Sequence, residues 1–223
     1  MFFLLYLQKV IIIIPANRNT QPLAVIVTND TAMTTQPDFY INSSGQISAE
    51  FVDRNILTFN QATLFVRQLP YGRNIDKNDL TSVFADNCGT CSTKHALLKQ
   101  LADENNFKEL RLTVGLFKMN GKNTPEISMT LKLNNLEYIP EAHCYLKYND
   151  LILDYTKQNS KPSDFIDDLI EEIEISPNQI TDYKVNYHKN YLRTWLDKTE
   201  QLNLTLSDLW KIREQCIQNL ADN

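Results

Sequence analysis

The 223-residue sequence predicts an α+β fold, with helices at both ends of the chain and an antiparallel sheet between them. Two patterns indicate this. Apolar residues recur at helical spacing after Cys91, whereas Leu110 to Phe117 alternates apolar with polar residues, as half-buried strands do. Two short apolar and aromatic runs around Asn149-Asp150 then predict a hairpin. The length suits a single domain with a substantial core.

The elements before the sheet are expected to be mainly helical. The segment from Ile56 to Leu69 reads as a strand or a helix, and a turn follows at Leu69 to Gly72. Apolar spacing from Leu80 to Phe84 indicates a short helix that ends before Asn87. A longer helix runs from Cys91 to about Asn106, with one apolar stripe facing the core.

The sheet region continues after Phe117. A loop rich in Asn, Gly and Pro is expected from Met119 to Pro125, and Glu126 to Pro140 has no clear period. The strands of the hairpin are placed at His143 to Tyr148 and Leu151 to Tyr155.

The chain from about residue 160 is expected to form a helical C-terminal tail. The acidic segment from Asp164 to Glu174 is interpreted as a helix with a solvated face. Two more helices are placed at Gln179 to Lys198 and Ser207 to Leu220, the second with Ser207 as its N-cap. Trp195 and Trp210 lie in apolar stripes that are expected to pack on the core.

The first 32 residues stand apart from this pattern as an apolar N-terminal extension. Met1 to Leu7 and Val10 to Ile14 are apolar, but the run is too short to span a membrane. It also lacks the basic start and cleavage site of a secretory signal. Met33 begins a polar sequence, so residues 1–32 are either an upstream extension or an apolar strand or anchor, and residues 33–223 form the domain.

Composition restricts the partners. The net charge of −5 argues against nucleic acid as a partner, because it offers no broad basic surface. Four cysteines in a chain of this length do not indicate a disulfide framework, so reduced thiols in the cytoplasm are expected. The sequence predicts no oligomeric state.

Cys91 is the first candidate for chemistry. It lies where a turn becomes a helix, with Gly89 permitting a sharp approach and Thr90 able to cap. A thiol at a helix N-terminus feels the positive end of the dipole, which favours thiolate below its usual pKa of about 8.5. The alternative is that Cys91 has only a structural role, as a small buried apolar residue.

The hairpin supplies a second argument. A two-residue turn at Asn149-Asp150 places Tyr145 opposite Asp154. Because side chains alternate along a strand, His143, Tyr145 and Asp154 then share one face of the sheet. His143 and Asp154 become diagonal neighbours, close enough for a carboxylate to orient an imidazole base. A three-residue turn would break this parity and leave His143 as an ordinary sheet histidine.

These residues carry a resemblance. Gly89 to Leu98 resembles the cysteine helix of the transglutaminase-like superfamily, Glu141 to Leu146 its histidine strand, and Ile152 to Asp154 its aspartate strand. The order and spacing fit over about 70 residues, and the whole chain also resembles a group of uncharacterised bacterial proteins with this core. The resemblance implies a papain-like core, in which a cysteine helix packs on an antiparallel sheet that presents His and Asp.

The function implied by the resemblance is cysteine-dependent acyl transfer or amide hydrolysis, as in a protease, a deamidase or a transglutaminase. Cys91 would be the nucleophile, His143 the base and Asp154 the residue that orients it, acting on a peptide or protein amide without a cofactor. The sequence differs from the superfamily pattern before the histidine, where Glu141-Ala replaces residues that are usually more open. No side-chain oxyanion donor is identified. The alternative is a non-catalytic binding module on the same core.

Two rival sites remain open. Cys88 and Cys91 form a CxxC pair, which would indicate thiol–disulfide chemistry if a strand directly preceded the helix. Cys88, Cys91, His143 and Cys144 have the residue types of a zinc site. However, His143 and Cys144 are adjacent in a strand and should point to opposite faces, which argues against zinc.

Overall fold

The computed structural model describes residues 10–13, 24–27, 36–42, 45–199 and 202–221, with only the backbone of the first two ranges. The chain divides into two compact units, 1–35 and 36–223. In the first unit, β1 (Val10–Ile13) pairs antiparallel with β2 (Ala24–Val27). The apolar run Met1 to Leu7 lies outside the described residues. Within the described part of the chain, no helix has the length and apolar content needed to cross a bilayer.

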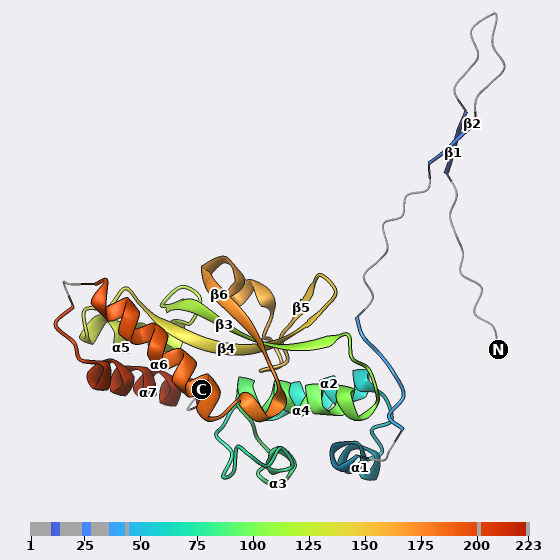
Figure 1. Cartoon of the computed structure of the whole chain (residues 1–223), viewed down its shortest axis with the longest axis horizontal. Coiled ribbons are helices and arrows are strands. Elements are labelled where there is room, and N and C mark those ends of the chain that lie inside the picture. The colour runs from blue at the N-terminus through green and yellow to red at the C-terminus, as the bar shows by residue number, and fades with distance from the viewer. Residues whose placement is uncertain (1–9, 14–23, 28–35, 43–44, 200–201, 222–223) are drawn as a thin grey trace, which may run out of the picture. The chain divides into compact units, whose positions relative to one another are not determined.

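The second unit is mixed α+β, as predicted, and is built around a four-stranded antiparallel sheet of order β5-β4-β3-β6 (Figure 1). The strands are β3 (Leu110–Asn120), β4 (Tyr138–Tyr148), β5 (Leu151–Leu153) and β6 (Leu169–Ile175). The two long central strands pair along their whole length, from Leu110 with Tyr148 to Asn120 with Tyr138. They form the platform on which the other elements pack.

Among the described residues, four α-helices precede this sheet: α1 (Gln46–Asp53), α2 (Phe59–Gln68), α3 (Ser82–Ala85) and α4 (Cys91–Glu104). The ambiguous segment after Ile56 is therefore a helix. Its start is explained by a capping box, in which Thr58 and Gln61 bond to each other's backbone N–H groups. The short helix before Asn87 is confirmed, whereas after α2 the chain is extended at Leu69 and forms an isolated bridge at Tyr71 in place of the predicted turn.

The helix α4 packs on one face of the sheet, against β3 and β4 (Figure 1). Its stripe of Leu97, Leu98 and Leu101 is fully buried, in one cluster with Leu112 and Val114 of β3. Burying a leucine side chain stabilises the fold by roughly 1.5–3 kcal/mol, so this stripe anchors α4 firmly. The start of the helix is thereby fixed relative to β4.

The hairpin of β4 and β5 has the predicted register. Tyr148 pairs with Leu151 and Leu146 pairs with Leu153, so the turn has two residues. Asn149 occupies the left-handed region at φ 50°, which asparagine tolerates well. Because β5 ends at Leu153, Asp154 follows directly at the end of the paired segment.

The prediction of a helix from Asp164 to Glu174 is wrong. Short 3-10 turns at Pro162–Asp164 and Ile166–Asp168 lead into the edge strand β6, which pairs with β3. A register shift between Leu116 and Phe117 interrupts the apolar alternation of β6, so its period of two is hard to read. Pairing with the open edge of β3 overrides the helical propensity of leucine and glutamate.

The remaining helices are α5 (Ser128–Leu133), α6 (Asp182–Asp197) and α7 (Leu206–Ala221). The last two confirm the helical tail, and both contribute to a second apolar cluster with Phe117 and Tyr145. The predicted N-cap is wrong by two positions. The Thr205 hydroxyl accepts from the Asp208 N–H at 3.2 Å, so Thr205 and not Ser207 caps α7.

Candidate functional site

Cys91 is the first residue of α4. The capping residue Thr90 donates its N–H to the Thr93 hydroxyl at 3.0 Å and accepts from the Thr93 N–H, which fixes the first turn. Among the described residues, none accepts a hydrogen bond from the N–H groups of Cys91 and Ser92. These groups form the positive end of the helix dipole, at the residue whose side chain is the candidate thiol and is 8% exposed.

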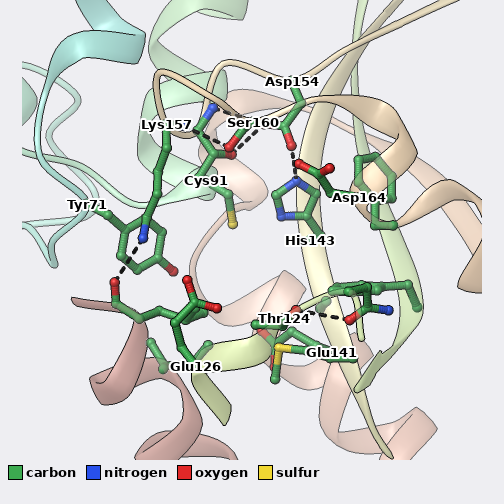
Figure 2. A pocket seen from close by; sticks show the side chains of 18 of the residues that line it. Tyr71, Cys91, Thr124, Glu126, Glu141, His143, Asp154, Lys157, Ser160 and Asp164 are labelled. Carbon is green, nitrogen blue, oxygen red and sulfur yellow. Dashed lines mark hydrogen bonds and ion pairs between the residues drawn. The ribbon is translucent and has the colours of Figure 1, made fainter. Parts of the chain in front are cut away.

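The loop before α4 is held by an isolated parallel bridge between Tyr71 and Gly89. Gly89 donates to the Pro70 carbonyl at 3.2 Å and accepts from the Gly72 N–H at 3.3 Å. A Cβ at Gly89 would lie 2.9 Å from Lys94 Cγ, so a glycine suits this close approach. These contacts place Tyr71 beside the start of the helix, as Figure 2 shows.

His143 and Asp154 meet as the hairpin register predicts. His143 Nε2 lies 3.0 Å from Asp154 Oδ2, so the hydrogen on this nitrogen is donated to the carboxylate. Figure 2 shows the other ring nitrogen of His143 directed toward the Cys91 sulfur. Phe165 packs on the imidazole, with ring centroids 4.8 Å apart. The three candidate residues therefore lie together, with the histidine between the thiol and the carboxylate.

The second oxygen of Asp154 is held by the chain that follows it. Oδ1 accepts from the Thr156 N–H at 2.9 Å and from the Thr156 hydroxyl at 2.6 Å. His95 also lies near Asp154, with Nε2 3.6 Å from Oδ1. However, this Nε2 accepts from the Tyr155 N–H at 2.8 Å, and Nδ1 donates to the Cys91 carbonyl at 2.8 Å. Both nitrogens of His95 are thus engaged with the backbone.

The electrostatics favour a thiolate–imidazolium pair. A hydrogen bond from Cys144 lowers the pKa of Cys91 well below its usual value, and Lys184 and His143 add to this against the effect of burial. Burial opposes a charged His143, but Asp154 and Cys91 raise its pKa to about 10. The pKa of Asp154 is depressed despite its burial, chiefly by the charge of His143. At neutral pH the proton therefore resides on the histidine.

Lys184 is a member of the site that the sequence did not reveal. It is only 8% exposed, and its Nζ donates to the Ser92 hydroxyl at 2.8 Å. The Ser92 hydroxyl also lies 3.5 Å from the Cys144 sulfur and 3.9 Å from that of Cys91. Burial disfavours a charged Lys184, yet the neighbouring thiols raise its pKa. A buried ammonium next to two thiols stabilises negative charge on Cys91.

A buried ion pair lies beside the histidine strand. Arg213 of α7 binds Glu141 with two hydrogen bonds, at 2.8 and 2.5 Å, and also contacts Glu214 at 2.8 Å. Glu214 in turn pairs with Arg73 at 2.5 Å. Arg213 holds the pKa of Glu141 low although burial would raise it. The unusual Glu141 before His143 therefore attaches α7 to β4.

Two cavities meet at Cys91. The larger, of about 270 Å³, has an apolar wall that includes Phe117, Met119 and Phe165, and His143 lies on it (Figure 2). The smaller, of about 130 Å³, extends from the start of α4 toward α6 and α7. Cys91 and Tyr71 line both cavities. Cys91 therefore lies at the boundary between the two cavities.

The rival sites find less support. Among the residues that the structure describes, no group of three or more His, Cys, Asp or Glu side chains is arranged to hold a metal ion. All four cysteines are free thiols. The helix α3, rather than a strand, precedes Cys88 in the chain, so the βα unit expected of a thioredoxin-type motif is not formed there.

We also compared the chain with known proteins. No protein-family model, no curated protein and no solved structure matches it significantly. The function therefore has to be argued from the geometry of Cys91, His143 and Asp154.

Proposed function

We propose that this protein is a cysteine-dependent enzyme that acts on amides through a Cys91–His143–Asp154 triad. One observation carries the proposal. The imidazole of His143 donates one nitrogen's hydrogen to Asp154 and turns its other nitrogen to a thiol at the start of a helix. This is the arrangement in which a base activates a nucleophile and a carboxylate orients the base.

The proposed reaction begins with attack of the Cys91 thiolate on the carbonyl carbon of the amide. A C–S bond forms, and the carbonyl π electrons move to the oxygen. The His143 imidazolium then gives its proton to the amide nitrogen, the C–N bond breaks, and the amine leaves. The product is a thioester on Cys91 and a neutral His143.

The tetrahedral intermediate needs hydrogen-bond donors for its oxyanion. The N–H groups of Cys91 and Ser92 are suitable, because no described residue accepts from them. The sequence identified no side-chain donor for the oxyanion, and the Tyr71 hydroxyl is the candidate that the site offers. It lines both cavities, and the described residues offer it no hydrogen-bond partner. Burial together with Cys91 and Glu141 raises the pKa of Tyr71, so the phenol remains protonated and able to donate.

Release of the acyl group reverses these roles. His143 removes a proton from water or from an amine, which attacks the thioester carbon, and the C–S bond breaks to restore the thiolate. With water the reaction is a proteolysis or deamidation, and with an amine it is a transglutaminase-like transfer. The larger cavity, which borders His143, offers room for either acceptor.

The proposed enzyme type is transglutaminase-like, on a papain-like core. Support comes from α4, which carries Cys91 and packs on an antiparallel sheet in which β4 carries His143 and the neighbouring strand β5 leads directly into Asp154. The free thiol that this chemistry requires fits the reducing cytoplasm, where we propose that the protein works.

The second candidate is a binding module that uses the same cavities without turnover. The low exposure of Cys91, 8%, favours it, because a substrate carbonyl must reach the sulfur. The two functions differ in whether the thiol is activated.

The test is the rate of Cys91 alkylation by iodoacetamide as a function of pH, followed by mass spectrometry of the modified peptide. We expect the rate to reach its plateau well below pH 8.5, because Cys91 is a thiolate there. In His143→Ala the inflection should move toward the usual value. Incubation with a p-nitrophenyl ester should also leave an acyl group on Cys91.

Cys88 provides an internal control in the same molecule. It lies three residues away and is more exposed, but burial and Asp86 raise its pKa. Alkylation of Cys88 should therefore begin only at alkaline pH and should ignore the His143→Ala change. Equal pH profiles for Cys88 and Cys91, or no acylation by the ester, would refute the enzymatic function and leave the binding module.

A further inference from the structure

The smaller cavity beside Cys91 has a distinct charge. Four cationic side chains line it, and they come from three parts of the chain: Arg73, Lys77, Lys184 and Arg213. Two carboxylates, Glu141 and Glu214, also line it. Four cations against three anions, the two carboxylates and the Cys91 thiolate, leave an excess of one positive charge within about 130 Å³. The excess is unusual in a chain whose net charge is −5.

The two carboxylates are already engaged. Glu141 takes two hydrogen bonds from Arg213, and Glu214 is shared by Arg73 and Arg213. Lys77 and Lys184 are therefore the cations of this cavity that have no described carboxylate partner. No described carboxylate lies within salt-bridge distance of either ammonium.

Lys184 has unused bonding capacity. An ammonium group has three N–H donors, and among the described residues only the Ser92 hydroxyl accepts from it. A lysine that is 8% exposed would be costly to keep charged without further partners. The N–H groups of Cys91 and Ser92 add the positive end of α4 to the same wall of the cavity. All of these groups suit an anion.

The cavity has a matching size. About 130 Å³ is several times the volume of roughly 30 Å³ that one water molecule takes in the liquid, so the cavity has room for a carboxylate or phosphate group. The larger cavity is different in character, because its apolar wall suits a side chain or an acyl chain. The two cavities therefore offer chemically different surroundings on the two sides of Cys91.

We propose that the smaller cavity binds a carboxylate or phosphate group of the substrate, and that the substrate is an amide carrying this acid group next to the bond attacked by Cys91. The proposal rests on the function proposed above and adds the class of substrate. In the resting protein, Lys184 also neutralises the thiolate; with substrate bound, Lys77 and Lys184 hold the acid group and fix the scissile bond.

The experiment compares two alkylating reagents of equal reach, anionic iodoacetate and neutral iodoacetamide, at Cys91 and neutral pH. The same thiolate attacks both reagents, so the rate constant for iodoacetate divided by that for iodoacetamide is independent of the thiolate fraction. We expect this ratio to exceed that of glutathione by roughly tenfold, because the cavity attracts the carboxylate. In Lys77→Gln and in Lys184→Met the ratio should fall toward the glutathione value.

The matched control is Lys198→Gln, which removes the same charge from an exposed lysine that does not line the cavity. It should leave the ratio unchanged. A ratio equal to that of glutathione, or one that Lys198→Gln lowers as much as Lys77→Gln, would overturn the proposal. If Lys184→Met does not fold, Lys77→Gln alone decides, because that side chain is exposed.

A thiol-independent measurement separates this proposal from the enzymatic one. Inorganic phosphate and acetate should each be titrated by their effect on Tm, in wild type and in Lys77→Gln. A rise that only wild type shows supports the anion site even if Cys91 proves unreactive, and the stronger of the two ions identifies the acid group. No rise with either ion, or the same rise in both proteins, would overturn the proposal.

Discussion

Two histidines lie near the same carboxylate, yet they differ in almost every chemical respect. His143 Nε2 is 3.0 Å from one oxygen of Asp154, and His95 Nε2 is 3.6 Å from the other. Burial lowers the pKa of His95, whereas Asp154 and Cys91 raise that of His143 to about 10 against the same effect. Proximity to a carboxylate does not by itself make a histidine basic.

The difference arises from the hydrogen-bond partners of the two ring nitrogens in each histidine. In His95 the Tyr155 N–H occupies Nε2, so this nitrogen has no hydrogen for Asp154 and the ring is fixed as a neutral tautomer. In His143 one nitrogen donates to Asp154, and the other faces a thiol that can exchange a proton with it. A histidine whose nitrogens both bond to the backbone supports the fold, whereas one that has a nitrogen facing a titratable thiol can exchange a proton with it.

The largest effect should follow from Asp154→Asn, which removes the carboxylate from both histidines. The Thr156 donors will retain the amide oxygen at the position of Oδ1, so the amide NH₂ will face His143. His143 Nε2 must then accept, and its hydrogen moves to the nitrogen that faces Cys91. We expect acylation by a p-nitrophenyl ester to fall by roughly 10³- to 10⁴-fold, as expected for the wrong tautomer.

The same variant can be followed by NMR titration of the imidazoles. The pKa of His143 should fall from about 10 toward the ordinary histidine range near 6.5. A His143 pKa that stays near 10 in Asp154→Asn would show that the carboxylate does not control the histidine.

The local elements near Cys91 could be predicted from the sequence because their signals are local. The helix from Cys91 needs only its apolar period and Thr90, and the hairpin needs only the Asn149-Asp150 turn. The acidic segment departs from the predicted helix because β6 acquires its conformation by pairing with β3. The two strands are far apart in sequence: even their nearest pair, Phe117 and Leu169, is separated by 52 residues. Strand pairing at such separation leaves no mark on the local period.

The candidate site could also be predicted only in part. The alternation of side chains along the hairpin strands predicts that His143 and Asp154 meet. It does not predict which residues of α6 lie near them. Lys184 is 92 residues from Ser92, to which it donates. A signal did exist, because Lys184 occupies the buried stripe of α6 with His188 and Leu192 at spacings of four. A lysine on an apolar helical stripe indicates a buried charge with a partner elsewhere.

The next largest effect concerns stability and distinguishes the second histidine. His95→Ala leaves the buried Tyr155 N–H without its acceptor and opens a cavity at a fully buried position. We expect a loss of roughly 2–4 kcal/mol in the free energy of unfolding, measured with urea. The pH inflection of Cys91 alkylation should stay within the error of the wild-type value. A shifted inflection with unchanged stability would make His95 part of the catalytic machinery.

The thiolate–imidazolium pair also predicts how stability depends on pH. The raised pKa of His143 stabilises the fold below about 6.5, and this contribution is lost as the pH rises toward 10. The lowered pKa of Cys91 stabilises the fold above about 8.5, and this contribution is lost as the pH falls. Between these limits the two slopes cancel, so their joint contribution is flat.

Cys91→Ala removes one of these slopes. Its unfolding free energy should fall with rising pH relative to wild type, by up to about 1.4 kcal/mol per pH unit between pH 6.5 and 8.5. Subtracting the wild-type curve removes the contributions of other titrating groups. Parallel curves for the two proteins over this range would exclude a thiolate–imidazolium pair in the folded protein.

The smallest effect should come from Thr156→Val, which removes one of the two donors on Asp154 Oδ1. The Thr156 N–H still binds that oxygen at 2.9 Å, so Oδ2 should continue to face His143. A hydrogen bond to a charged group contributes roughly 1.5–3 kcal/mol, and part of this is retained by the N–H, so we expect a loss of about 1 kcal/mol in stability. Ester acylation should change by less than about fivefold, because the tautomer of His143 is preserved. A loss as large as that of Asp154→Asn would mean that the hydroxyl alone fixes the carboxylate, and that the backbone N–H is not enough to keep Oδ2 on His143.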